Sequence, residues 1–392
     1  MDKCNLLWVQ THPTQYVSPL LDKISESKNI NLKAIYISDF STKKYYDKQF
    51  LKSINWDVNL LSNHKFEFLN KNSKTIRFYL PLILPSFKLL LLLKESDYIV
   101  IQGWQHYMLI IIGIIGKILG KKVLQRSETP AFMKLDKNRL VFKKSFLHKL
   151  VSFVSISISD YFLFIGTLNK NYYLSRGIKS NKLFLSPYAV NDLLFKENLE
   201  KSFYKNNFKI NFKNKNPTLL YASKLTERKN ILSLLDQYKD KFVDNLNFII
   251  VGNGPLSQKV IEFIKHNNLS ENVKFLGFVN QNQLPYIYSI SDIFILPSYG
   301  ENWGVVINEA MCGSCAIIAS NEVGAAYDLI KHKSNGFIYK SSNKKGIAKA
   351  INFCIEEKRY ISMGKKSKEI IKNWNYDATI NTLNKIIFQS KR

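Results

Sequence analysis

Short runs of apolar residues alternate with longer polar or amphipathic segments along most of the chain. Such runs with polar boundaries are typical of buried parallel strands, and the segments between them are long enough for crossover helices. The runs that fit are residues 6–9, 32–37, 98–102, 122–125, 161–165 and 182–186, followed by 219–222, 248–251, 273–275, 293–296, 316–319 and 336–339. The pattern predicts an α/β fold with two doubly wound parallel sheets.

The two series of strands are separated by a polar stretch rich in lysine and asparagine, residues 196–217, which we interpret as a linker. We therefore expect one Rossmann-like domain over residues 1–195, a second over 218–375, and a terminal helical segment over 376–392. A chain of 392 residues with 46% hydrophobic content can form two cores. Two such domains facing each other would create a cleft at the carboxyl ends of both sheets, where open α/β sheets bind ligands.

Two apolar runs, residues 78–93 and 107–119, are candidates for membrane spans. Prolines and a lysine break the first run and Lys117 interrupts the second, so neither reaches the roughly 20 apolar residues that a span requires. We expect buried or interfacial helices instead. The first residues, MDKCN, lack the pattern of a secretion signal, and four cysteines form no disulfide framework in so long a chain. A cytoplasmic protein is predicted.

The chain is strongly basic, with 57 basic and 30 acidic residues giving a net charge of +27. Such an excess suggests an anionic partner, either a nucleic acid, a membrane surface or a phosphorylated substrate. Compositional bias also explains part of it, because the lysines are spread among many asparagines and isoleucines. A local basic cluster at residues 134–149, interleaved with Phe and Leu, is a candidate for contact with an anionic bilayer or a solvated helix face. No aromatic and basic recognition motif is found, so we predict no nucleic-acid partner.

The strongest chemical signal is a pair of acids, Glu301 and Glu309, separated by seven residues. The surrounding pattern predicts a strand at 293–296, a polar turn at 298–304 and a helix at 305–311. A helix N-terminus binds anions, whereas carboxylates accept hydrogen bonds from hydroxyl groups. A nucleotide sugar offers hydroxyls on both sides of its diphosphate and would match both features. The alternative is a surface glutamate followed by an ordinary amphipathic helix.

This segment carries a resemblance to a known family. The pattern P-S-x-x-E-x-W-G-x-x-x-x-E-A-M-x-G at residues 297–313 resembles the signature of retaining GT-B glycosyltransferases of family 4. The residues around 220–230 are similar to the family's G-R-L-x-x-x-K-G, with Lys224 at the arginine position and Lys229 at the lysine position. Residues 250–255, which include Gly252, resemble its V-G-x-G-P turn. The similarity is clear over residues 219–340, whereas the first 190 residues match only in pattern.

The resemblance implies a GT-B fold, with two Rossmann-like domains and parallel sheets facing across a cleft. The donor would bind to residues 218–375 and the acceptor to residues 1–195, with the terminal helix packing near the first domain. The resemblance further implies that Glu309 binds the donor ribose, Glu301 a hydroxyl of the transferred sugar, and the backbone near Phe278 the base. The reaction of this family retains the anomeric configuration.

The leaving diphosphate requires stabilisation of its negative charge, and the chain contains no D-x-D motif for a metal. We expect a fixed positive field instead, formed by Lys224 and Lys229, with Arg228 as a rival to Lys229 because it binds phosphate in a bidentate manner. Backbone N–H groups at the helix start would add to this field, and the candidates are Asn302, Trp303, Gly304 and Val305. No metal and no cofactor are predicted; the nucleotide sugar is a substrate, with a UDP-sugar favoured over a GDP-sugar.

The first domain departs from the family pattern at two places. Residues 11–15, THPTQ, stand where family members often have a Gly-Gly loop, and Glu128 stands where many have a histidine. We list the acceptor-side candidates His12, Gln15, His106, Arg126 and Glu128, of which His12 and Glu128 are candidates for catalysis. The alternative for His12, Arg126 and Glu128 is a packed or solvated residue, and for His106 a core histidine beside a tryptophan.

The leading hypothesis is a metal-independent retaining hexosyltransferase that acts on a glycan or lipid-linked oligosaccharide in surface polysaccharide or lipopolysaccharide biosynthesis. It would work in the cytoplasm, at the inner face of the cell membrane if the basic cluster contacts lipid. An epimerase of sugar nucleotides or a phosphorylase with the same fold is an alternative. A nucleic-acid-binding protein is a distant third.

Overall fold

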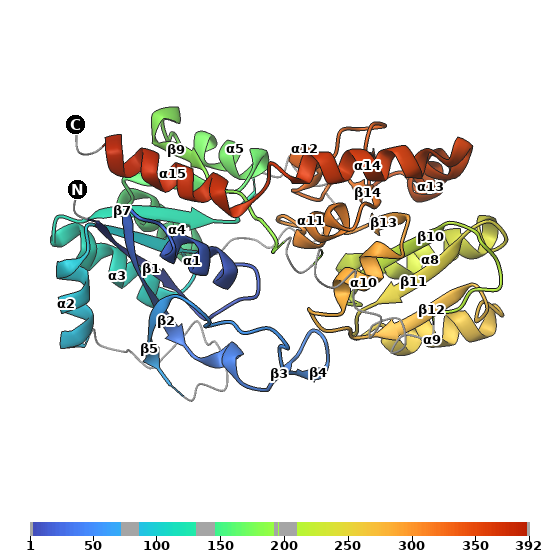
Figure 1. The fold of residues 1–392 in the computed structure, drawn as a ribbon, viewed down its shortest axis with the longest axis horizontal. Helices are drawn as coiled ribbons and strands as arrows, with labels where there is room; N and C mark the ends of the chain where they lie inside the picture. Colours follow the sequence, from blue (N-terminus) through green and yellow to red (C-terminus); the bar gives the residue numbers. More distant parts are fainter. Residues whose placement is uncertain (1–2, 72–85, 131–145, 192–194, 196–209, 390–392) are drawn as a thin grey trace. The chain divides into compact units, whose positions relative to one another are not determined.

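A computed structural model describes residues 3–71, 86–130, 146–191, 195 and 210–389. The chain divides into two compact units (Figure 1). Unit 1 comprises Met1–Tyr45, Asn59–Tyr188 and Tyr376–Arg392, and unit 2 comprises Tyr46–Val58 and Ala189–Asn375. Most of the predicted linker lies outside the described residues, at 196–209, and so does most of the predicted basic cluster, at 134–145.

Unit 1 contains a parallel seven-stranded sheet with the order β5-β2-β1-β6-β7-β8-β9. Its strands are β1 Cys4–Gln10, β2 Ile30–Ser38, β5 Lys65–Asn70, β6 Tyr98–Gln102, β7 Lys122–Ser127, β8 Tyr161–Phe164 and β9 Leu183–Leu185. All six strands predicted for this half are present, and β5 was missed. All its pairings run parallel, for example β1 with β2 and β6 with β7.

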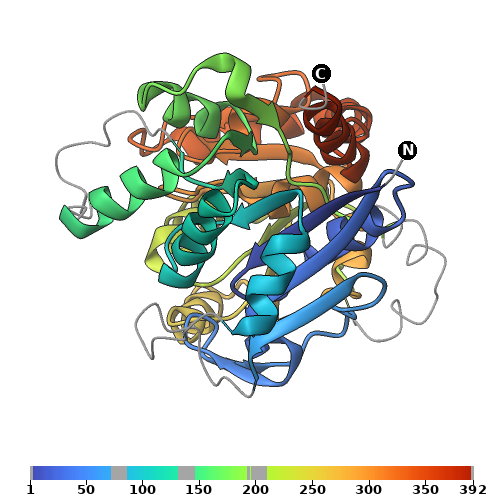
Figure 2. The ribbon, with the colours of Figure 1, turned by 90° about the vertical axis from the view of Figure 1, so that its left-hand side faces the viewer.

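Helices cover both faces of this sheet, because successive side chains of a strand point to opposite faces. Leu6 and Trp8 of β1 pack in one core with α1 and α15, whereas Leu7 and Val9 pack in another with α2 and α3. Figure 2 shows these helices and strands of unit 1 with the left-hand side of Figure 1 facing the viewer. Its helices are α1 Ser18–Ser25, α2 Phe87–Glu95, α3 Tyr107–Ile118, α4 Phe146–Ser157, α5 Thr167–Ser175 and α15 Tyr376–Gln389, with short 3₁₀ turns η1 Phe40–Thr42 and η2 Ser180–Lys182.

Unit 2 contains a parallel six-stranded sheet with the order β12-β11-β10-β13-β14-β15. The strands are β10 Thr218–Ala222, β11 Asn247–Val251, β12 Val273–Gly277, β13 Ile293–Leu296, β14 Ala316–Ser320 and β15 Gly336–Tyr339. All six predicted strands of this half are present. Together, the two units confirm the predicted fold class of two Rossmann-like α/β domains with parallel sheets.

The helices of unit 2 also lie on both sides of its sheet. One core joins the strands to α8, α9 and α13, while α10 and α11 pack together and α11 contacts β13 and β14. The helices are α8 Ile231–Lys241, α9 Ser257–His266, α10 Leu284–Ser289, α11 Val305–Cys312, α12 Ala326–Leu329, α13 Gly346–Ile355 and α14 Arg359–Ile371, with 3₁₀ turns η3 Glu227–Lys229 and η4 Glu356–Lys358.

A small two-stranded sheet lies in the first part of the chain, where residues 46–58 belong to unit 2 although the residues on either side belong to unit 1. Its strands are β3 Tyr45–Asp47 and β4 Lys52–Ile54. The chain leaves unit 1 after Tyr45 and returns to it at Asn59. The apolar pattern predicted none of this, because both strands are short and mostly exposed or half-buried.

The two apolar runs that we weighed as membrane spans contain α2 and α3. Residues 72–85, which include the start of the first run, lie outside the described residues. No helix within the described ranges has both the length and the apolar character needed to cross a membrane.

Candidate donor and acceptor sites

The sheet of unit 2 has a topological switch point between β10 and β13. These two strands are neighbours, yet the chain moves from β10 outward to β11 and β12 on one side, and from β13 to β14 and β15 on the other. Ligands of open α/β sheets bind at the carboxyl ends of the strands beside such a point. The loop after β10 carries Lys224 and leads to Lys229, and the loop after β13 carries Glu301.

Glu301 is the centre of a charge cluster at this switch point. Its carboxylate accepts hydrogen bonds from Nζ of Lys229 and, at 3.2 Å, from the guanidinium of Arg228. Lys229 is only 8% exposed, whereas the Arg228 side chain is 52% exposed. Burial lowers the pKa of Lys229, while the charge and hydrogen bond of Glu301 act in the opposite direction. The buried ammonium group of Lys229 therefore lies directly beside the Glu301 carboxylate that accepts its hydrogen bond.

The loop that carries Glu301 is held by the loop after β14. The backbone N–H of Gly300 donates to the carboxylate of Glu322 at 3.1 Å, and the N–H of Glu301 donates to the backbone oxygen of Glu322 at 2.9 Å. Gly324 in turn donates to the backbone oxygen of Glu301 at 3.0 Å. Sequence reasoning missed Glu322 as a positioning residue, although its place after a buried strand would have put it at the same edge of the sheet.

The start of α11 adopts a conformation that requires glycine. Gly304 precedes the helix with φ of 94°, and a Cβ there would lie 2.9 Å from Cδ2 of Leu296. Trp303 is buried and donates its indole N–H to Asn308 at 2.9 Å, while Asn302 is exposed and Val305 is half-buried. The first N–H groups of a helix lack intrahelical acceptors, so this turn can face an anion.

Glu309 lies on α11 within the protein rather than on its surface. It is 6% exposed, and its carboxylate accepts hydrogen bonds from Nε2 of Gln281 at 3.0 Å and from the hydroxyl of Tyr288 at 2.8 Å. Burial raises the pKa of Glu309, although both hydrogen bonds act in the opposite direction. Gln281 follows β12, so Glu309 stands near the carboxyl end of the sheet. Neither partner was predicted from the sequence.

The remaining predicted donor residues lie on the neighbouring loops of unit 2. Gly252 has φ of 130°, and a Cβ there would lie 1.9 Å from the backbone oxygen of Ser223, so only glycine lets the two loops approach. Phe278 follows β12 and is half-buried. Lys224 is close enough to Lys229 to help lower the pKa of that residue.

In unit 1 the acceptor-side candidates lie along the equivalent edge. The strand order has its switch point between β1 and β6, and His12 and Gln15 follow β1 while His106 follows β6. His12 is half-buried, its Nδ1 lies 2.9 Å from Oγ1 of Thr11, and burial lowers its pKa to about 4. His106 is 5% exposed and caps α3, accepting at Nδ1 from the N–H of Met108 at 3.2 Å.

Arg126 lies near the end of β7 and Glu128 directly after it, in different surroundings. Arg126 is fully buried and donates to Ser186, to the backbone oxygen of Pro187 and to Gln102 at 2.9–3.2 Å. Its guanidinium also lies 4.8 Å from the ring centre of Tyr188. These contacts position Tyr188, whose hydroxyl donates to Glu128, itself half-buried.

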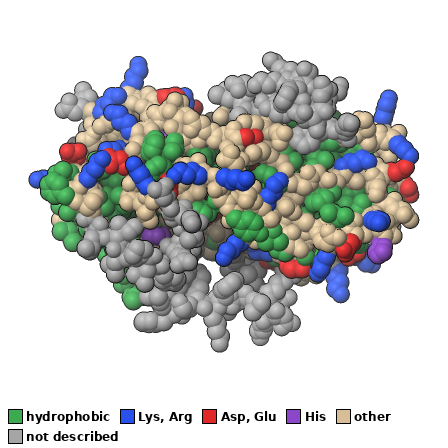
Figure 3. Space-filling view, turned by 90° about the horizontal axis from the view of Figure 1, so that it is seen from below, with side chains coloured by type: hydrophobic (Ala, Val, Ile, Leu, Met, Phe, Trp, Pro, Cys, Tyr) green, Lys and Arg blue, Asp and Glu red, His purple; other side chains and the backbone are tan. Residues whose placement is uncertain are grey.

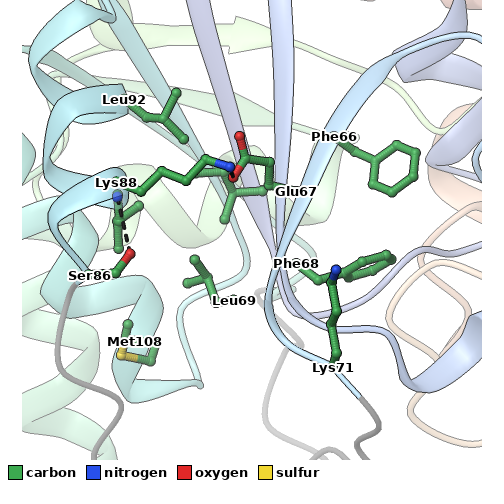
Figure 4. A pocket seen from close by; sticks show the side chains of 11 residues that line it. Phe66, Glu67, Phe68, Leu69, Lys71, Ser86, Lys88, Leu92 and Met108 are labelled. Carbon is green, nitrogen blue, oxygen red and sulfur yellow. Dashed lines mark hydrogen bonds and ion pairs between the residues drawn. The ribbon is translucent and has the colours of Figure 1, made fainter.

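A separate pocket of about 320 Å³ lies in unit 1 beside β5 and α2 (Figure 4). Leu69, Leu92 and Met108 form apolar parts of its lining, and an ion pair of 2.9 Å joins Lys88 to Glu67. None of the residues that line it is among the predicted site residues. In the part of the chain that the structure describes, no group of three His, Cys, Asp or Glu residues could hold a metal ion.

In unit 2, cationic side chains, two carboxylates and the start of α11 lie near the switch point of a Rossmann-like domain. The fold of the whole chain is that of GT-B glycosyltransferases. Anabaena HepE in complex with UDP and glucose has a TM-score of 0.68 at 14% identity, covering 98% of this chain and 100% of that one. Sucrose-phosphate synthase from Thermosynechococcus elongatus also has a TM-score of 0.68, at 17% identity, covering 99% of both chains.

Sequence comparison points to the same class. Residues 202–374 match the model of the family described as glycosyl transferases group 1. Over 174 residues the chain is 25% identical to a GDP-mannose-dependent alpha-(1-6)-phosphatidylinositol monomannoside mannosyltransferase of Mycobacterium tuberculosis, covering 41% of this chain and 45% of that protein. The chain thus spans less than half the length of this relative. The family match lies in the second half of the chain, whereas the likeness to the two solved structures covers nearly the whole chain and shows its fold.

Proposed function

We propose that this protein transfers a hexosyl group from a nucleotide sugar to a glycan or lipid-linked glycan acceptor, with retention of anomeric configuration. In this proposal unit 2 binds the donor, unit 1 binds the acceptor, and the product belongs to a surface polysaccharide or lipopolysaccharide. The observation that carries the proposal is the cluster at the switch point of unit 2, where Lys229 and Arg228 meet on Glu301.

The cluster contains the charges that the reaction needs. Lys229, Arg228 and Lys224 would stabilise the negative charge that develops on the leaving diphosphate, together with the N–H groups at the start of α11. Glu301 would exchange its cationic partners for a hydroxyl of the transferred sugar, and Glu309 would bind the ribose. Preorganised positive charge of this kind makes a metal ion unnecessary, so we propose metal-independent transfer.

The acceptor hydroxyl would attack from the face that the diphosphate leaves. A diphosphate oxygen can take the hydroxyl proton, so no protein base is obligatory. His12, with its pKa of about 4, is neutral at physiological pH and can accept a hydrogen bond from the acceptor. Glu128 and Gln15 are the other polar groups that we propose for the acceptor side.

The nucleobase of the donor has two candidates, uracil and guanine. We favour a UDP-sugar, in line with the UDP bound to HepE, whereas the mannosyltransferase relative depends on GDP-mannose. Both nucleotides must therefore be tested.

We further propose that unit 1 contacts an anionic membrane at the inner face of the cell membrane. The support is a row of three neighbouring helices, α2, α3 and α4, whose outer faces expose large apolar side chains. Figure 2 shows these helices next to one another. Their exposed apolar residues are Phe87, Leu90, Leu91, Ile114, Ile118, Leu150 and Phe153. A lipid-linked acceptor would be reached from such a surface.

The direct experiment is analysis of products after incubation of UDP- and GDP-sugars with and without lipid-linked glycan acceptors. We expect a new glycoside and free nucleoside diphosphate only when an acceptor is present. Conversion of the donor to an epimer without acceptor would identify an epimerase, and release of a sugar phosphate in the presence of inorganic phosphate would identify a phosphorylase. Either result would refute the transferase proposal.

A further inference from the structure

The segment 46–58, which contains β4 and the last two residues of β3, lies within unit 2 against the loops after β10 and β12. At one end it holds Lys224. Nζ of Lys224 donates to Oε1 of Gln49 at 2.9 Å and to the carboxylate of Asp47 at 3.2 Å, and it lies 4.5 Å from the ring centre of Phe50. Lys224 is therefore paired with the carboxylate of Asp47.

The other end of the segment lies against the loop after β12. The ring of Phe278 packs against Phe50 at 5.2 Å and against Trp56 at 6.5 Å, between ring centres. Further along, Asp57 accepts hydrogen bonds from the backbone N–H of Asn282 at 3.2 and 3.3 Å. The segment thus extends from Lys224 to the loop around Phe278, where the family resemblance implies that the base binds.

Asp47 is held in position by backbone hydrogen bonds that do not involve Lys224. Its Oδ1 accepts from the backbone N–H groups of Gln49 at 2.7 Å and Phe50 at 3.0 Å, which leaves Oδ2 for Lys224. The side chains of Asp47 and Lys224 are 17% and 28% exposed, so water and salt screen this pair less than a pair on the open surface. Little side-chain entropy remains to be lost when the pair forms.

We propose that Asp47 occupies the place on Lys224 that the donor diphosphate takes, so that nucleotide binding replaces one anion with another. This inference rests on the proposed function. A ligand that binds only after Asp47 has left Lys224 has an apparent affinity reduced by the fraction of molecules in which the pair is broken. Asp47 therefore weakens the binding of donor and of the product nucleoside diphosphate alike, and returns to Lys224 when the product leaves.

The test is titration calorimetry of UDP, GDP and ADP with wild type and Asp47→Asn. The asparagine retains an oxygen for the N–H groups of Gln49 and Phe50 but has no charge. A pair of this exposure contributes up to about 1 kcal/mol, so we expect Asp47→Asn to bind the preferred nucleotide about threefold to fivefold more tightly. In a Lys224→Met background, the same substitution is expected to have no effect, as a double-mutant cycle requires.

Asp57→Asn is the matched control, because it makes the same substitution in the same segment at a carboxylate that contacts Asn282. We expect its affinity to equal that of wild type. Unchanged or weaker binding by Asp47→Asn would overturn the inference, and so would equal tightening by Asp57→Asn, which would point to loosening of the segment. Absence of nucleotide binding by every variant would overturn the proposed function and this inference with it, whereas equal binding by wild type and Asp47→Asn would overturn the inference alone.

Discussion

Glu309 shows how a single side chain of this site is maintained at a cost to stability. Its carboxylate is buried and accepts hydrogen bonds from Gln281 and Tyr288, and burial raises its pKa. A carboxyl group whose pKa is higher in the folded state binds its proton more tightly there. The folded state therefore loses stability as the pH rises through 4.5 and towards the raised pKa, and the loss is complete above it.

Replacing this carboxylate by a neutral amide is thus expected to stabilise the unliganded protein. For Glu309→Gln we predict a melting temperature about 2–4 °C above wild type at pH 7, which corresponds to roughly 1 kcal/mol for a unit of this size. The difference should vanish as the pH falls towards 4.5, the ordinary pKa of a glutamate. Thermal melts at a series of pH values check this, with the exposed Glu262→Gln as control. A difference in melting temperature between Glu309→Gln and wild type that widens at acidic pH would contradict a raised pKa of Glu309.

At the scale of elements, the outer faces of α2, α3 and α4 were not predicted as a surface. Sequence reasoning placed membrane contact at residues 134–149, most of which lie outside the described residues. Phe87, Leu90 and Leu91 recur at the three- and four-residue spacing of a helix face, as do Ile114 and Ile118. Figure 3 shows hydrophobic and basic side chains together on the surface of the molecule. Lys94 in the last turn of α2 and Lys122 at the start of β7 add exposed positive charge to unit 1.

We predict that the protein sediments with vesicles that contain anionic phosphatidylglycerol and remains free of neutral phosphatidylcholine vesicles. Combined substitution Phe87→Ser, Leu91→Ser and Phe153→Ser should reduce the bound fraction about tenfold, because each side chain contributes roughly 1 kcal/mol or more of apolar transfer energy. Ile361→Ser, at an isoleucine that is 49% exposed on α14, is the control and should bind like wild type. Equal binding by the triple variant would exclude these helices as the lipid surface.

At the scale of the whole molecule, the apolar pattern predicted the parallel strands because most of them, such as β10, β11, β13 and β14, are buried on both faces. β5 was not predicted, because its residues Lys65–Asn70 are exposed or half-buried at the edge of the sheet. Motifs singled out Glu301 and Lys229, which follow two neighbouring strands, but did not predict the ion pair between them. The pair Asp47 and Lys224 could not be predicted, because its partners are 177 residues apart and β3 has no motif or pattern that indicates it.

The central claim is that unit 2 binds the diphosphate of a nucleotide sugar through Lys229 at the switch point. The most direct test is calorimetric titration of UDP- and GDP-sugars into wild type, Lys229→Met and the control Lys265→Met, an exposed lysine of α9. We predict binding of one donor by wild type and by the control alike, and binding about 10–100-fold weaker by Lys229→Met, as expected for the loss of a charge-assisted hydrogen bond. Equal donor affinity in folded Lys229→Met and wild type would contradict the account.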